Sequence, residues 1–322
     1  MSNSHGNPQR APNPSRDGTP QAKPTGSPRD NSLLLTPAVT RLIELAIEED
    51  LGRGDATTQA LVDPGTLATA HLVARQRLTL AGLDVAAAVF HRLDPSIAID
   101  TLILDGAEAQ PAARIATYRG SAAALLAGER TALNFLQRLS GVATLVRAFT
   151  AAAQGTNLRI TDTRKTTPGF RLLEKYAVRV GGGSNHRFDL GSGVLIKDNH
   201  VAIAGSVSEA VRRAKGRVPH SLNIEVEVDT LAQLDEALAA GVAIILLDNF
   251  STADLEQALA RVRTAKPRPL VEVSGGVTLA RIPELARLGV DLVSVGALTH
   301  SAPAADLALE MEIAPAPAGR MA

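Results

Sequence analysis

Charged and small polar residues follow six short apolar runs in the second half of the chain, and residues of these types bind anions and divalent cations. The runs occupy residues 158–163, 193–198, 223–228, 243–248, 269–274 and 291–296. The residues at or just after their ends include Asp162, Arg164, Lys165, Lys197, Glu227, Asp248, Ser274 and Gly296. If the runs are parallel strands, these residues meet at one face, as in the active sites of β/α barrels. One such residue is commonly a helix cap, but six ends in succession indicate a binding site.

Basic residues concentrate between positions 159 and 187, although the whole chain has a formal net charge of zero. Arg164, Lys165 and Arg187 flank glycines and turns, so we expect them to bind a polyanionic ligand. An arginine can hold a carboxylate or phosphate with two parallel hydrogen bonds, which a lysine cannot reproduce. Three further basic residues lie in the predicted helix RLLEKYAVR and are interpreted as its solvated face: Arg171, Lys175 and Arg179.

Glycines follow the last two apolar runs, where they suit phosphate binding. Ser274, Gly275 and Gly276 end the fifth run, and Gly296 ends the sixth. Backbone amides at such turns can approach a phosphate closely, with help from the following helix N-terminus. The glycine run 181–183 is interpreted as a flexible connection.

Two carboxylates are candidates for a magnesium site. Glu227 and Asp248 point to the same barrel mouth if the runs are parallel strands. Carboxylates beside a phosphate-binding site would hold Mg2+ or sugar hydroxyls. Ion pairing with Lys197 or Arg187 is an alternative that is compatible with this role.

Thiol chemistry is excluded because the chain contains no cysteine, which also removes disulfides and thiolate zinc sites. His186 and His200 are potential metal ligands, but neither has a third ligand at matching spacing. We therefore expect both histidines to bind substrate or to make local hydrogen bonds.

The spacing of the apolar runs predicts the elements that carry these residues. Amphipathic helices are expected between the runs, near 205–215, 230–240, 252–263 and 278–287. Thr230 and Thr278 are the expected N-caps of the second and last of these. Strands alternating with helices indicate a parallel sheet with right-handed crossovers. About six such units favour a barrel or near-barrel over an open sheet.

The first half of the chain predicts a mixed α/β region. A helix begins after Thr36, and another long helix covers residues 122–153, with Gly128 and Gly141 as close-packing or bending points. Strands are expected at 67–75 and 97–103, with a helix between them at 83–93. The segment after Leu298 is rich in alanine and acidic residues and is expected to fold back as a last helix.

Composition narrows the class of protein. Aromatic residues are scarce and tryptophan is absent, so the core must be built from Ala, Val, Leu and Ile. The balanced charge argues against a nucleic-acid or membrane-surface binder. Residues 1–32 lack an apolar core and predict a disordered tail rather than a signal peptide. No apolar run is long enough to span a bilayer, and a soluble cytoplasmic protein is expected.

Long blocks of the sequence closely resemble the quinolinate phosphoribosyltransferase family. The central signature is TDTRKTTPGFRLLEKYAVRVGGGSNHRFDL at 161–190, followed by LIKDNH at 195–200. Other blocks are similar and occur in the right order: EEDLGRGDATT at 48–58, ERTALNFLQRLSGVAT at 129–144, EVEVDTL at 225–231, LLDNF at 246–250, VSGGV at 273–277 and VGALTHS at 295–301. The resemblance covers residues 36 to about 310.

The resemblance implies a fold and a reaction. The fold is an N-terminal α/β sandwich domain followed by an incomplete β/α barrel, in a homodimer or larger homo-oligomer. We accordingly expect a sandwich domain at 33–142, joined by the segment 299–313, and a barrel with the active site at 143–298. The reaction converts quinolinate and phosphoribosyl pyrophosphate, with Mg2+, to nicotinate mononucleotide, pyrophosphate and CO2.

The resemblance also implies roles for individual residues. Arg164, His186 and Arg187 would bind the quinolinate carboxylates, and Lys165 and Lys197 would contact the anionic groups of the substrates. The remaining roles are as follows: Glu227 and Asp248 for the ribose hydroxyls and the metal, Ser274, Gly275, Gly276 and Gly296 for the 5′-phosphate, and Arg130 for the partner subunit's site.

Three alternatives remain open from the residues themselves. A related phosphoribosyltransferase with another acceptor is disfavoured because Arg164 and Arg187 with His186 suit a dicarboxylate. A Schiff-base aldolase using Lys197 would need a desolvated lysine, yet Lys197 lies beside Asp198. A phosphate-binding barrel without turnover is the weakest alternative, because the charged set is intact.

Overall fold

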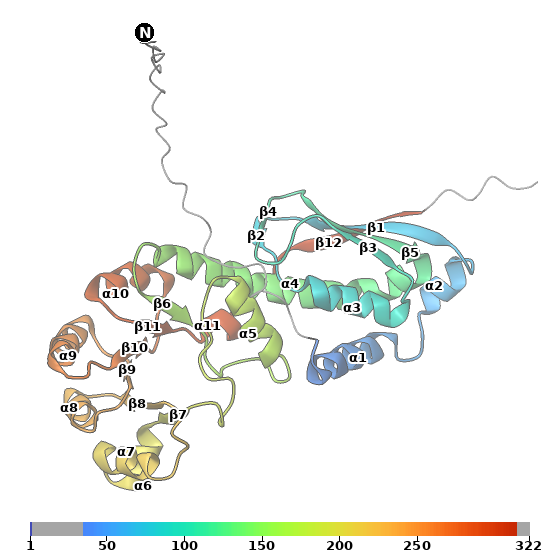
Figure 1. Cartoon of the computed structure of the whole chain (residues 1–322). Coiled ribbons are helices and arrows are strands. Elements are labelled where there is room, and N and C mark those ends of the chain that lie inside the picture. The colour runs from blue at the N-terminus through green and yellow to red at the C-terminus, as the bar shows by residue number, and fades with distance from the viewer. Residues whose placement is uncertain (2–34, 314–322) are drawn as a thin grey trace, which may run out of the picture. The chain divides into compact units, whose positions relative to one another are not determined.

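Two β-sheets organise the part of the chain that a computed structural model describes, namely Met1 and residues 35–313. The predicted disordered tail, residues 1–32, lies outside the described residues apart from Met1. The expected fold class, an N-terminal α/β sandwich domain followed by an incomplete β/α barrel, is confirmed: an antiparallel sheet with helices precedes a parallel sheet with helices (Figure 1).

The first sheet is antiparallel and has the strand order β12-β1-β5-β3. Its strands are β1 (Leu67–Ala74), β3 (Ala98–Thr101), β5 (Arg114–Ser121) and β12 (Leu307–Ile313), and a separate two-stranded ribbon pairs β2 (Leu78–Thr79) with β4 (Glu108–Ala109). The helices of this region are α1 (Pro37–Leu51), α2 (Ala56–Leu61), α3 (Leu83–Leu93) and α4 (Ala122–Ala152). Thr36 caps α1 by accepting a hydrogen bond from the Val39 amide.

The long helix α4 needs glycine at two points where other segments approach it. A Cβ at Gly128 would lie 2.9 Å from the Phe90 ring of α3, and one at Gly141 would lie 2.0 Å from the carbonyl oxygen of Pro303. The prediction that both glycines are close-packing points is confirmed. Through these contacts α4 is held against α3 and against the segment that leads to β12.

The second sheet is parallel and has the strand order β6-β11-β10-β9-β8-β7. Its strands are β6 (Arg159–Thr161), β7 (Val194–Ile196), β8 (Ile224–Val228), β9 (Ile244–Asp248), β10 (Leu270–Ser274) and β11 (Leu292–Ser294). Among the described residues no pairing joins β6 to β7, so the sheet is an incomplete barrel. Its buried side chains are mainly Val, Ile and Leu, as expected for parallel strands covered by helices.

The connecting helices follow the predicted alternation. They are α5 (Arg171–Val180), α6 (Asp198–Ala204), α7 (Val207–Lys215), α8 (Leu231–Ala239), α9 (Thr252–Thr264), the 3-10 helix η2 (Leu279–Arg281), α10 (Ile282–Leu288) and α11 (Ala297–His300). Thr230 caps α8 by accepting from the Gln233 amide. Thr278 precedes η2 but makes no side-chain capping hydrogen bond. None of the described helices is both long and apolar enough to cross a membrane.

The prediction of a last helix after Leu298 is wrong. Apart from the short α11, the segment forms β12, which pairs antiparallel with β1 so that Leu309 lies opposite Leu72. Leu307, Leu309 and Met311 pack against the core, and the acidic residues alternate with them. This period of two is the pattern of a strand with one buried face. The C-terminal segment therefore returns to the first sheet as a strand (Figure 1).

Candidate functional site

A cavity of about 590 Å³ lies at the C-terminal ends of the parallel strands. Eleven of the twelve site residues expected from the sequence line it: Arg164, Lys165, His186, Arg187, Lys197, Glu227, Asp248, Ser274, Gly275, Gly276 and Gly296. The twelfth, Arg130, is exposed on α4 and does not line this cavity. Sequence reasoning gave no role to three further polar residues that line it: Thr163, Ser294 and His300.

The loop after β6, which carries Arg164 and Lys165, is fixed by hydrogen bonds at both ends. The buried Glu174 carboxylate accepts from the Thr167 amide at 3.0 Å and from the Thr167 hydroxyl at 2.9 Å. The Thr299 hydroxyl donates to the Lys165 carbonyl at 2.8 Å. These contacts hold two cationic side chains at the cavity wall, and those made by Glu174 tie the loop to α5, the helix that follows.

The next loop, residues 184–187, is held by a buried ion pair. Lys175 Nζ lies 2.5 Å from Asp162 Oδ1 and donates to the His186 carbonyl at 3.0 Å. The Asp162 carboxylate also accepts from the His186 amide at 2.9 Å and from Asn185 Nδ2 at 2.6 Å. Burial raises the pKa of Asp162 and lowers the pKa of Lys175, and the attraction between the two opposes both shifts.

The prediction that Lys175 belongs to a solvated face is wrong, because its side chain is fully buried. Arg171 is also engaged, donating to the Thr166 hydroxyl and to the Phe188 carbonyl. Of the three basic residues on α5, Arg179 alone is exposed. The amphipathic pattern identified the helix but assigned its face incorrectly at Lys175.

Replacing Lys175 by methionine is expected to lower the free energy of unfolding by about 3–5 kcal/mol, because it leaves the Asp162 carboxylate buried without its partner. The measurement is chemical denaturation monitored by circular dichroism. The double variant Lys175→Met with Asp162→Asn removes the uncompensated charge and is expected to recover part of the loss. A single variant as stable as the wild type would contradict this account of the loop.

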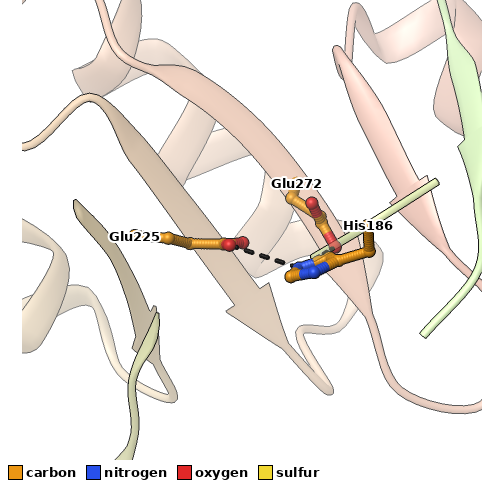
Figure 2. Close-up of side chains that lie close together, drawn as sticks. All are labelled: His186, Glu225 and Glu272. Atoms are coloured by element: carbon orange, nitrogen blue, oxygen red, sulfur yellow. Dashed lines mark ion pairs between the residues drawn. The ribbon is translucent and has the colours of Figure 1, made fainter. Parts of the chain in front are cut away.

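Two buried glutamates of the sheet lie under the ring of His186. His186 Nε2 lies 3.2 Å from Glu225 Oε2 and 3.7 Å from Glu272 Oε1 (Figure 2). Glu225 comes from β8 and Glu272 from β10, and both side chains are buried. Sequence reasoning found no third ligand near His186, whereas the ligand atoms of these three side chains lie within 4.8 Å of one another, close enough to hold a metal ion. The available signal was a glutamate in the middle of an otherwise apolar run, PLVEVS.

Burial, together with the nearby Glu225 carboxylate, raises the pKa of Glu272 to about 7. Burial lowers the pKa of His186, but its two carboxylate neighbours more than offset this, so the net shift is upward. Two carboxylates in one buried cluster cannot both ionise cheaply. Glu272 is therefore the carboxylate of the cluster that takes up a proton as the pH falls through the neutral range.

The raised pKa of Glu272 is expected to make the free energy of unfolding depend on pH. Its pKa is about 7 in the folded protein against an ordinary value of 4.5, so the folded protein binds this proton more tightly than the unfolded chain does. Protonated Glu272 therefore adds about 3 kcal/mol to the free energy of unfolding. This stabilisation is fully present below the pKa of the unfolded chain and is lost as the pH rises through the pKa of the folded protein. Denaturation of the wild type and of Glu272→Gln at pH values between these two pKa values isolates the contribution of Glu272. Parallel stability curves would contradict the assignment.

The two candidate metal-binding carboxylates end neighbouring strands, β8 and β9. Glu227 forms an ion pair with Lys197, as the sequence alternative anticipated. Asp248 accepts a hydrogen bond from Asn249 Nδ2 at 2.7 Å. Asn249 adopts a positive φ of 56° and packs against Gly275, where a Cβ would lie 2.1 Å from Asn249 Oδ1. Both carboxylates face the cavity, and hard oxygen ligands of this kind suit Mg2+.

The glycine turns after β10 and β11 follow the two strands that come next after β9 in the sheet order and line the same cavity. Gly275 and Gly276 have φ values of 88° and 56°, which favour glycine. A Cβ at Gly296 would lie 3.0 Å from Lys165 Cδ and 3.2 Å from His300 Nε2. The absence of side chains at these turns leaves backbone and cationic groups facing the same space, which is the chemistry that binds a phosphate.

The remaining predictions concern residues outside the cavity. His200 makes a local hydrogen bond, accepting from the Lys197 amide at 3.0 Å. A local hydrogen bond was one of the two roles expected for this histidine. The glycines at 181–183 pack closely rather than acting as a flexible connection. A Cβ at Gly181 would lie 2.6 Å from Val146, and one at Gly183 would lie 2.9 Å from Val178.

Comparison with known proteins decides the family. The model of the quinolinate phosphoribosyl transferase N-terminal domain matches residues 55–140, and that of the C-terminal domain matches residues 142–310. The chain belongs to the quinolinate phosphoribosyl transferase family. The N-terminal domain model thus matches the region of the first sheet, and the C-terminal domain model matches the parallel sheet.

Relatives in this family are similar over most of their length. The nicotinate-nucleotide pyrophosphorylase [carboxylating] of Mycobacterium leprae is 46% identical over 275 residues, which cover 84% of this chain and 95% of that protein. The human protein of the same name is 40% identical over 88% of this chain and 97% of its own length. The crystal structure of NadC from Streptococcus pyogenes matches with a TM-score of 0.83 at 40% identity, covering 88% of this chain and all of that one.

Proposed function

We propose that this protein transfers the phosphoribosyl group of phosphoribosyl pyrophosphate to the ring nitrogen of quinolinate, with loss of CO2, to give nicotinate mononucleotide and pyrophosphate. The observation that carries the proposal is the lining of one cavity by four basic side chains, two carboxylates and two glycine turns. The relatives are named nicotinate-nucleotide pyrophosphorylase [carboxylating], a name that describes the reverse of this reaction, in which CO2 is taken up. In the direction that releases CO2, the product nucleotide belongs to de novo synthesis of NAD.

Arg164 and Arg187 would bind the two quinolinate carboxylates, because guanidinium groups pair with carboxylates through parallel hydrogen bonds. Arg187 reaches the cavity with Nη1 donating to the Gly193 carbonyl at 3.0 Å, so its guanidinium is already oriented. Burial and the nearby Arg164 lower the pKa of Arg187, and a bound dianion would offset that repulsion. His186 precedes Arg187 on the second of the two loops that carry these arginines, and it lines the same cavity.

The glycine turns would bind the 5′-phosphate, with Ser274, Gly275, Gly276 and Gly296 supplying backbone or hydroxyl donors. Lys165 would contact the same phosphate or the acid, since its side chain lies against Gly296. Lys197 would contact the pyrophosphate or the acid, after exchanging its ion pair with Glu227 for a substrate anion.

Glu227 and Asp248 would bind the ribose hydroxyls and, with substrate oxygens, Mg2+. Bound Mg2+ would neutralise charge on the departing pyrophosphate. Loss of pyrophosphate generates cationic character at the anomeric carbon, which these two carboxylates would stabilise electrostatically. Lys197 would balance the same carboxylates before substrate enters.

Decarboxylation would follow from charge placement rather than from a dedicated acid or base. Once the ring nitrogen is alkylated, its positive charge stabilises the electron pair left when the adjacent carboxylate departs as CO2, and a proton from water then bonds to that ring carbon. The residues here would contribute by holding the ring in place and by surrounding it with cations. The protein would therefore lower the barrier by orienting the substrates and by placing charges around them.

A homodimer or larger homo-oligomer with shared sites belongs to the same proposal. Arg130 is exposed on α4 and away from the cavity of its own chain, so it would act in the site of a partner subunit. We also place the protein in the cytoplasm, because both substrates are multiply charged and do not cross a bilayer unaided.

The test is mass spectrometry of the products formed from quinolinate, phosphoribosyl pyrophosphate and Mg2+. Equal amounts of nicotinate mononucleotide and pyrophosphate are expected. A paralogue with another acceptor would give neither product from quinolinate but would form pyrophosphate with a different pyridine acid. No pyrophosphate with any acceptor would leave a phosphate-binding barrel without turnover.

A further inference from the structure

Both ring nitrogens of His186 are already engaged by the protein. The Arg187 amide donates to His186 Nδ1 at 2.7 Å, and His186 Nε2 lies 3.2 Å from Glu225 Oε2 (Figure 2). A nitrogen that accepts an N–H hydrogen bond cannot carry a proton itself. The proton of the neutral ring is therefore on Nε2, from which it is donated to Glu225.

This tautomer limits what His186 can do in the cavity. A ring with Nε2–H directed at Glu225 and Nδ1 directed at a backbone amide has no N–H left for a substrate anion. The same arrangement disfavours a metal ion in the cluster of His186, Glu225 and Glu272, because an ion at Nε2 would displace this proton onto Nδ1. The Arg187 amide lies against Nδ1 and leaves no room for a proton there.

The carboxylates beneath the ring are not explained by stability. Glu225 Oε1 and Glu272 Oε1 are buried and have no hydrogen-bond partner among the described residues. Burying carboxylates costs free energy that apolar side chains at the same positions would not cost. Both carboxylates contact the His186 ring, which forms part of the cavity wall.

We propose that Glu225 and Glu272 are positioning residues for acceptor binding: they fix the His186 ring, which in turn fixes the Arg187 amide and so the place of the Arg187 guanidinium. The chain of contacts runs from the sheet to the substrate wall through three side chains and one peptide group. On this inference, which rests on the proposed function, His186 orients Arg187 and the guanidinium makes the contact with the acid. The elevated pKa of Glu272 agrees with this role, since a protonated neighbour leaves Glu225 as the acceptor.

The test compares Glu225→Met, which keeps the volume but removes the acceptor, with Glu225→Gln, which keeps an acceptor oxygen. Glu225→Met is expected to raise the KM for quinolinate about 10- to 100-fold, the cost of one lost hydrogen bond to a buried group. The KM for phosphoribosyl pyrophosphate is expected to stay within about twofold, and Glu225→Gln to restore most of the affinity for the acid. Glu256→Met, at an exposed position of α9, is the matched control.

Separate outcomes distinguish this inference from the proposed function. A wild-type protein that does not use quinolinate sinks the proposed function, whereas an active wild type with an unaffected Glu225→Met variant overturns the positioning role. Nitrogen-15 NMR of His186 in the wild type provides a readout that needs no turnover and no variant. At a pH above the raised pKa of the ring, a signal from protonated Nε2 and unprotonated Nδ1 is expected. A neutral ring with its proton on Nδ1, or a transition-metal ion that is retained by the wild type and lost from Glu225→Met, would overturn the inference.

Discussion

Replacement of Arg187 by alanine is expected to lower kcat/KM for quinolinate about 100- to 1,000-fold. The guanidinium lines the cavity beside Arg164, and its loss would leave one carboxylate of the acid without a charged partner. Charge-assisted contacts of this kind contribute about 3–4 kcal/mol when an unpaired group remains in the site, and each 1.4 kcal/mol is tenfold in rate. Steady-state kinetics with quinolinate as the varied substrate provide the measurement.

The control for Arg187→Ala is Arg217→Ala, at an exposed position outside the cavity. The control is expected to retain wild-type kinetics, and both variants are expected to unfold at wild-type temperatures. Arg187 is held by one hydrogen bond to Gly193, so the fold does not depend on it. Near-normal turnover in Arg187→Ala would contradict the assignment of the acid-binding wall.

Arg130→Ala is expected to abolish activity although the altered residue lies outside the cavity of its own chain. Mixing Arg130→Ala subunits with Arg187→Ala subunits then gives a distinctive result. A mixed dimer contains one cavity with an intact Arg187 that faces an intact Arg130 from its partner. Random reassociation into dimers places such a cavity in about a quarter of all sites, so about a quarter of wild-type activity should return.

An arrangement in which Arg130 acts within its own chain predicts a different recovery of activity. If Arg130 acted within its own chain, every site in the mixture would lack one arginine and no activity would return. Each variant measured alone provides the baseline, and denaturation followed by joint refolding ensures that subunits exchange. Recovery well below the expected fraction, with mixed dimers demonstrated by mass, would contradict a shared site.

The ends of the parallel strands were predictable because several apolar runs end in a charged residue that is not buried without a partner. Lys197, Glu227 and Asp248 mark such ends, and all three line the cavity. The order of runs and helices was enough to place them at one face, because parallel strands share the direction in which they end. The site residues therefore followed from local pattern plus one rule of topology.

The failures share a cause, which is a partner distant in sequence. Lys175 has a position on α5 that resembles an exposed one, and its partners, Asp162 and the His186 carbonyl, are distant in sequence. Strand β12 has an alanine- and acid-rich sequence that favours a helix, yet pairing with β1 decides its conformation. In each case tertiary contact overrides local propensity.

Glu272 illustrates a second limit of prediction from the sequence. A glutamate within an apolar strand is usually exposed at an edge, and composition gives no sign that Glu225 and His186 surround it. The shift in its pKa arises from burial beside another carboxylate, which depends on the packing of β8, β9 and β10. Chemistry of this kind appears only once the strands are placed side by side.

The measurement that tests the central claim most directly is CO2 release from carboxyl-labelled quinolinate in the presence of phosphoribosyl pyrophosphate and Mg2+. Release is expected only when all three components are present, and nicotinate added as the acceptor in place of quinolinate is expected to yield no nucleotide. That result would establish both the reaction and the choice of a dicarboxylate. A folded protein that releases no CO2, or that joins nicotinate to the ribose equally well, would contradict the account.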